Sequence, residues 1–145
     1  MTSSELKRIA DERASEVIPN PPLDLSERRA RFDDTATAIA DDVSVREVEI
    51  DGMFADWILT PNADLNSRIL YLHGGGYSVG SKISHRLLAA DIAHASKSAV
   101  LVLDYRLAPE FKYPAPVEDA LVAYGWMRNV GPQGEQDCKY AFIAG

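Results

Sequence analysis

The sequence predicts an α/β fold built on a mostly parallel sheet. Three short apolar runs, at residues 68–72, 99–103 and 140–144, have the composition of strands that are buried on both faces. Longer stretches of helical character separate them, at about 83–97 and 117–128. This alternation of strand and helix predicts parallel strands joined by right-handed crossovers, with helices on the faces of the sheet.

An antiparallel hairpin is predicted ahead of this unit. Residues 43–50 largely alternate between apolar and polar side chains, as a half-buried strand does. Asp51-Gly52 is a turn signal, and residues 54–59 form the returning strand. A polar loop at 61–66 then leads to the first buried strand.

The first 42 residues are predicted to be helical. One helix precedes the proline-rich run at 19–22, because proline cannot continue the hydrogen-bond ladder. A second helix begins at Asp24, with Glu27 at capping-box spacing, and runs to about Ala40. We therefore divide the chain into a helical segment, 1–42, and a sheet-forming domain, 43–145.

Composition excludes several classes of function. The chain has 145 residues, 46% of them hydrophobic, and a net charge of −7 from 15 basic and 22 acidic residues. This acidic balance argues against nucleic acid and against anionic membrane surfaces as partners. No signal peptide and no apolar run of about 20 residues are present, so we expect no membrane span. One cysteine permits no internal disulfide and is consistent with the cytoplasm.

The loop His73-Gly74-Gly75-Gly76 carries the chemistry. It follows a buried strand, at the edge of the sheet where open α/β folds bind ligands. Consecutive glycines let backbone N–H groups approach a ligand, and such donors stabilise the oxyanion of ester hydrolysis. Two other readings are a flexible glycine turn and a dinucleotide loop. The spacing of Gly74, Gly76 and Gly80 is one residue too long for the dinucleotide fingerprint.

A second block of residues carries a family resemblance. Asp104-Tyr105-Arg106-Leu107-Ala108-Pro109-Glu110 is followed by Tyr113-Pro114-Ala115-Pro116-Val117-Glu118-Asp119-Ala120. Together with the glycine loop, this block closely resembles the hormone-sensitive lipase family of α/β hydrolases, the bacterial group IV esterases. The resemblance covers about 43–145, and the helical segment is similar to the family's N-terminal cap. It implies the N-terminal part of an α/β-hydrolase fold.

The family resemblance assigns roles to residues of the glycine loop. It implies an esterase that acts on short acyl esters through a Ser-His-Asp triad, without metal or other cofactor. The backbone N–H groups of Gly75 and Gly76 correspond to the family's oxyanion donors. His73 is then the motif histidine that orders the loop, and Tyr77 the aromatic residue that lines the substrate pocket.

The charged residues of the second block are expected to be structural. The resemblance implies that Arg106, Glu110 and Asp119 form polar contacts that hold the following loop and helix. A solvated charge cluster is the alternative. We interpret His85 and His94 as surface or helix-packing residues, with His85 near the pocket mouth, and Cys138 as a packing or surface thiol.

The family's next element would be the nucleophile elbow Gly-Asp-Ser-Ala-Gly, and Gly145 corresponds to its first glycine. We therefore expect the triad to be absent from the 145 residues, and the chain alone to be inactive. We also expect strand 140–144 to be an exposed edge through which the chain self-associates.

Two alternatives to an esterase stay open: a non-catalytic binding protein for small ligands, as in the plant gibberellin receptors, and an inert fragment. Amidase chemistry would use the same loop.

Overall fold

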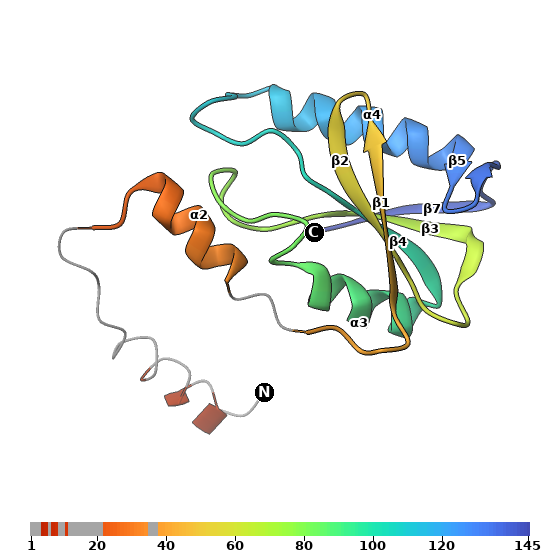
Figure 1. Ribbon diagram of the computed structural model, residues 1–145, viewed down its shortest axis with the longest axis horizontal. Helices are drawn as coiled ribbons and strands as arrows, with labels where there is room; N and C mark the ends of the chain where they lie inside the picture. The colour runs from red at the N-terminus through yellow and green to blue at the C-terminus, as the bar shows by residue number, and fades with distance from the viewer. Residues whose placement is uncertain (1–3, 6, 9–10, 12–21, 35–37) are drawn as a thin grey trace.

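The computed structural model describes residues 4–5, 7–8, 11, 22–34 and 38–145. Within them lies a five-stranded mixed sheet of order β1-β2-β4-β3-β7, together with a small two-stranded sheet. The α/β class and the N-terminal hairpin are therefore confirmed (Figure 1). In chain order the elements are α2 Leu25–Asp33, β1 Ser44–Ile50, β2 Met53–Leu59, β3 Asp64–Leu72, α3 Arg86–Ser96, β4 Ser98–Leu103, α4 Ala115–Asn129, β5 Val130–Gly131, β6 Gly134–Glu135 and β7 Tyr140–Ala144.

The sheet joins an antiparallel hairpin to a parallel core. β1 and β2 pair around Asp51-Gly52, whose φ angles of 51° and 80° are both positive, as a tight hairpin turn requires. β2 pairs antiparallel with β4, whereas β3 pairs parallel with both β4 and β7. The carboxyl ends of β3, β4 and β7 therefore meet at one edge of the sheet, where the glycine loop begins.

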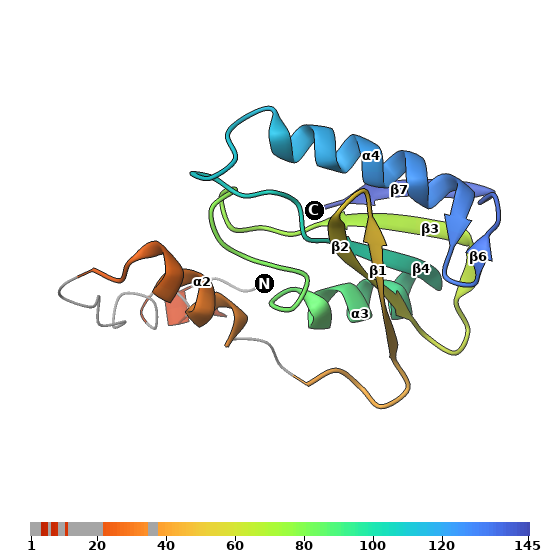
Figure 2. The ribbon, with the colours of Figure 1, turned by 45° about the horizontal axis from the view of Figure 1, so that its top comes forward.

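Two apolar layers cover the two faces of the sheet. Leu70 packs with Met127 of α4 on one face, while the neighbouring Tyr71 packs with Ala90 of α3 on the other. This is the alternation that a strand with two buried faces produces. Figures 1 and 2 show α4 and α3 on opposite sides of the sheet, with β3 and β4 between them.

Several predicted boundaries are corrected by the structure. The predicted first helix falls largely outside the described residues. α2 has the predicted capping box between Asp24 and Glu27, but it ends at Asp33 rather than near Ala40. Asp33 and Asp34 are poor helix formers, and their negative charges are repelled by the negative C-terminal end of the helix dipole. Helix 83–97 was also predicted too long at its start, since α3 begins at Arg86.

Hydroxyl groups explain the late start of α3. Ser81 Oγ accepts hydrogen bonds from the backbone N–H groups of Ile83 and Ser84, both at 3.1 Å. Such side-chain contacts offer the backbone an alternative to the helical ladder. Elsewhere β3 begins at Asp64, earlier than the predicted start at residue 68, and residues 130–135 form the short β5–β6 hairpin, for which no element was predicted.

A buried charge network fixes the start of α3 to the N-terminal hairpin. Asp56 of β2 is 1% exposed and accepts from Lys82 Nζ at 2.8 Å and Arg86 Nη2 at 2.5 Å. Lys82 Nζ also donates to Glu47 of β1 at 2.5 Å. Because an unpaired buried charge is costly, Asp56 needs both cations to be stable in the interior.

The helical segment and the outer strand complete the fold. α2 lies beside the loops at the carboxyl edge of the sheet (Figure 2), and its contacts are described below. The division at residue 42 into two domains stays a prediction.

β7 pairs with β3 on one side only within the described residues, and it exposes Phe142 and Ile143. Among the described residues, no helix has the length and apolarity needed to span a membrane.

Candidate functional site

The loop at 73–80, called here the glycine loop, has a backbone that few residues other than glycine adopt. Gly75, Gly76, Tyr77 and Gly80 have φ angles of 124°, 59°, 59° and 91°. A Cβ on Gly75 would lie 1.9 Å from the carbonyl oxygen of Val79, and one on Gly80 would lie 2.3 Å from that of Gly74. Side chains are therefore excluded from both positions, and the loop folds back tightly on itself.

His73 forms the buried base of the loop. Its Nδ1 lies 2.8 Å from the carbonyl oxygen of Gly74, which can only accept, so Nδ1 carries the proton. Nε2 is buried and has no partner among the described residues. Burial lowers the pKa of this ring, because protonation would place a charge there without a hydrogen-bond acceptor. His73 is thus held neutral, with one fixed tautomer.

Tyr105 supports His73 from the side. Its ring stacks on the imidazole with centroids 4.3 Å apart, and its hydroxyl donates to the carbonyl oxygen of His73 at 2.5 Å. Burial raises the pKa of Tyr105 to about 12, so the hydroxyl stays a donor at any ordinary pH. Tyr105 belongs to a motif of the sequence, but no role was predicted for it; its position two residues after β4 was the available signal.

The two predicted oxyanion donors have free backbone amides. Within the described part of the chain, the N–H groups of Gly75 and Gly76 donate to no protein acceptor. The carbonyl of Gly75 instead accepts from the N–H groups of Ser78 and Val79, both at 3.2 Å. The loop therefore uses its inner carbonyl for closure and leaves these two donors available.

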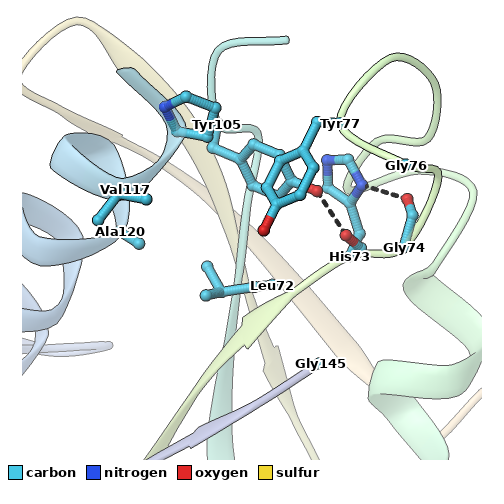
Figure 3. Close-up of a pocket in the computed structure, with 10 residues that line it drawn as sticks. Leu72, His73, Gly74, Gly76, Tyr77, Tyr105, Val117, Ala120 and Gly145 are labelled. Atoms are coloured by element: carbon cyan, nitrogen blue, oxygen red, sulfur yellow. Dashed lines mark hydrogen bonds between the residues drawn. The ribbon is translucent and has the colours of Figure 1, made fainter. Parts of the chain in front are cut away.

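A cavity of about 430 Å³ lies beside the loop (Figure 3). Its walls are mainly apolar, and Tyr77 and Tyr105 stand opposite Val117 and Ala120 of α4. Gly76 lines the cavity, whereas Gly75 is not among the lining residues. The lining residues are Leu72, His73, Gly74, Gly76, Tyr77, Tyr105, Pro116, Val117, Ala120 and Gly145.

The structure brings Arg106 and Asp119 together. Asp119 is 4% exposed and accepts from the Arg106 guanidinium at 2.6 Å and from its backbone N–H at 2.8 Å. The hydrogen bond to Asp119 raises the pKa of Arg106. This pair fastens the loop that follows β4, residues 104–114, to α4, and so fixes one wall of the cavity.

Glu110 lies elsewhere than its two predicted companions. It binds Arg29 of α2, with its two carboxylate oxygens 2.8 and 2.7 Å from the guanidinium nitrogens. The hydrogen bond to Arg29 lowers the pKa of Glu110 to about 2. Arg29 was not predicted as a site residue, because its partner is 81 residues away and no local pattern marks such a pair.

His85 also contacts the glycine loop. Its Nε2 accepts from the N–H of Gly74 at 3.3 Å, so Nδ1 carries the proton and donates to Ser84 Oγ at 3.0 Å. In this tautomer His85 is no base for Ser84. Burial lowers the pKa of His85. His94 lies on the surface near Asp42, and Cys138 is a partly exposed free thiol.

Comparison with known proteins decides the family. A family model described as alpha/beta hydrolase fold matches residues 69–145. An acetyl-hydrolase from Streptomyces hygroscopicus is 35% identical over 130 residues, covering 88% of this chain and 36% of that protein. A crystal structure of an esterase/lipase from an uncultured bacterium is 37% identical, with a TM-score of 0.83. The match covers 99% of this chain and 47% of the esterase/lipase chain.

A crystal structure of an esterase from the bacterial hormone-sensitive lipase family is 35% identical to this chain, with a TM-score of 0.79. The match covers 99% of this chain and 48% of that esterase chain. The chain belongs to the hormone-sensitive lipase family of α/β hydrolases. It spans about half the length of the solved family members it matches, and a smaller share of the curated acetyl-hydrolase.

The glycine loop of this chain also contains a serine pattern that was not considered among the sequence-based predictions. Gly76-Tyr77-Ser78-Val79-Gly80 has the Gly-x-Ser-x-Gly pattern of a nucleophile elbow. The hydroxyl of Ser78 contacts the carbonyl oxygen of Gly75 at 3.4 Å, and no imidazole hydrogen-bonds to it within the described residues. The positive φ lies at Tyr77 rather than at the serine. Ser78 therefore lacks both the base and the backbone of an activated nucleophile.

Replacing Gly75 by alanine should disrupt the loop. The new Cβ would meet the Val79 carbonyl at a φ that alanine resists, so we expect a loss of about 2–3 kcal/mol in the free energy of unfolding. Chemical denaturation measures this loss. Gly125→Ala is the matched control, because Gly125 lies in α4 with open space around it, and alanine should stabilise that helix by up to about 1 kcal/mol. Equal effects of the two substitutions would contradict the proposed packing of Gly75.

The lowered pKa of His85 predicts a pH-dependent stability. A histidine whose pKa is lower in the folded chain contributes stability that is present above about pH 6.5 and is lost as the pH falls below it. We expect His85→Gln to reduce the difference between the unfolding free energies at pH 7.5 and pH 5. A wild-type dependence retained in His85→Gln would refute the assignment.

Proposed function

We propose that this chain forms the oxyanion-hole part of a carboxylic-ester hydrolase. When a nucleophile attacks an ester carbonyl, negative charge builds up on the oxygen. Backbone N–H groups that already point at that position stabilise the charge without reorganising. In this proposal, the amides of Gly75 and Gly76 are those donors, His73 orders the loop, and Tyr77 lines the acyl pocket.

One observation carries the proposal. Two neighbouring amides lack protein acceptors in the described structure, and they belong to a glycine loop that borders an apolar cavity at the carboxyl edge of the sheet. Gly76 is exposed and Gly75 is partly buried, so both N–H groups are open to water or to a ligand that replaces it. The position also agrees with the general rule for ligand sites in α/β folds.

The whole protein is proposed to hydrolyse short acyl esters by a Ser-His-Asp mechanism. A serine forms the acyl-enzyme, a histidine transfers the protons, and the oxyanion is held at the glycine loop. Support for small acyl groups comes from relatives named acetyl-hydrolase and ethyl acetate hydrolase. The triad would lie outside the 145 residues, and the single free cysteine is consistent with action in the cytoplasm.

The chain by itself should bind a short carboxylate but should not hydrolyse an ester. Titration with butyrate, whose carboxylate oxygen resembles the oxyanion, should shift the ¹H–¹⁵N signals of Gly75 and Gly76 in NMR spectra. Gly52, at the distant β1–β2 turn, is the internal control and should not move. No saturable hydrolysis of p-nitrophenyl butyrate is expected, because no described serine is hydrogen-bonded to a histidine that acts as its base.

Two results would overturn this proposal: absence of any shift at Gly75 and Gly76 at saturating butyrate, or turnover of the ester that an organophosphate blocks. Butyrate binding by a longer protein that carries an intact triad, yet with no hydrolysis, would favour the alternative of a non-catalytic ligand-binding protein.

We also propose that the 145-residue chain associates with a second copy through β7. The side chains of Tyr140, Phe142 and Ile143 are 50%, 53% and 58% exposed, and one edge of the strand has no partner strand in the described structure. Such an apolar edge is a template for pairing.

Light scattering after size exclusion should show an average mass that rises with concentration. Phe142→Lys should suppress this rise, because charge blocks edge pairing. Leu121→Lys, at an apolar position of α4 that is 67% exposed, is the matched control and should not suppress it. A monomer at all concentrations would contradict the proposal.

A further inference from the structure

One side chain of α2 joins both loops of the site. The guanidinium of Arg29 donates from Nε to the carbonyl oxygen of Ser78 at 2.9 Å and from Nη2 to that of Ala108 at 3.0 Å. Its two terminal nitrogens also bind the carboxylate of Glu110 at 2.8 and 2.7 Å. Ser78 belongs to the glycine loop, and Ala108 and Glu110 belong to the loop at 104–114.

The carbonyls that Arg29 holds are directly connected to the proposed site. Ser78 comes two residues after Gly76, and Ala108 donates its backbone N–H to the carbonyl of Tyr77 at 2.7 Å. The two loops thus meet in a backbone hydrogen bond at Tyr77, and Arg29 closes the same junction from the side of α2. α2 makes a second contact directly after the glycine loop, where Ser81 Oγ donates to Asp33 at 2.5 Å.

We propose that Arg29 is a positioning residue of the site: it holds the glycine loop against the 104–114 loop and thereby sets the direction of the Gly75 and Gly76 amides and the place of Tyr77. The role of those amides at an oxyanion rests on the function proposed above. The clamping of the two loops does not depend on it.

The chemistry of arginine explains why this position takes it. The guanidinium presents donors in a rigid planar fork, so one group satisfies a bidentate carboxylate and two carbonyls at once. The ammonium of lysine is a compact charge that cannot span these acceptors. Because Arg29 and Glu110 have side chains that are 30% and 49% exposed, their ion pair contributes little to global stability. Loss of Arg29 should therefore reduce the local stability of the two loops and leave the stability of the sheet unchanged.

The test uses two backbone amides that report the junction. Val79 N–H bonds to the Gly75 carbonyl, and Ala108 N–H bonds to the Tyr77 carbonyl. In Arg29→Gln and in Arg29→Lys, we expect hydrogen exchange at both amides to quicken by about tenfold or more, with protection in β4 unchanged. Arg28→Gln, an exposed arginine of the same helix, is the matched control and should change neither amide.

Glu110→Gln separates the ion pair from the positioning contacts. It removes the charge but leaves the bonds from Arg29 to the two carbonyls, so exchange should quicken less than in Arg29→Gln. Wild-type protection at Val79 and Ala108 in Arg29→Gln would overturn the proposal, and so would an equal rise across β4, which would indicate general unfolding. If butyrate fails to shift Gly75 and Gly76 in the wild type while Arg29→Gln still frees the junction, the proposed function fails and the positioning role stands.

Discussion

The arrangement depends on a backbone that leaves no room for side chains at two points. Gly75 lies against the carbonyl of Val79 and Gly80 against that of Gly74, so the loop after β3 closes at distances that a Cβ would prevent. Its closure is what turns the N–H groups of Gly75 and Gly76 away from internal acceptors. A loop with larger residues would have to open, and its donors would then be paired or directed elsewhere.

This tight backbone is supported from three directions. Below it, the neutral ring of His73 stacks on Tyr105 and bonds back to the loop. On one side His85 accepts from Gly74. On the other side Arg29 holds Ser78 together with the 104–114 loop. Each support comes from a different part of the fold: the segment that follows β4, the N-cap of α3, and α2. The loop is therefore a junction of the fold, and its geometry does not rest on its own sequence alone.

The buried charge pairs also hold elements around the glycine loop in place, at a greater distance from it. Asp56 anchors the start of α3 through Lys82 and Arg86, and Asp119 anchors the 104–114 loop through Arg106. Charged groups with so little exposure are stable only when paired, so each pair permits few relative positions of the two elements it connects. The cavity borders the two elements that the Arg106–Asp119 pair joins, with Tyr105 on one side and Val117 and Ala120 of α4 on the other.

Sequence alone determined the local features: the apolar runs that form β3, β4 and β7, the Asp51-Gly52 turn, the α2 capping box, and the glycine loop with the motif that indicates the family. These features have signals within a few residues, because backbone preference and side-chain periodicity are local properties. Only the tertiary structure decided that Glu110 binds Arg29 and that Tyr105 and His85 support the loop. Such contacts join residues that are far apart in the chain, and they exist only after the sheet has brought its loops to one edge.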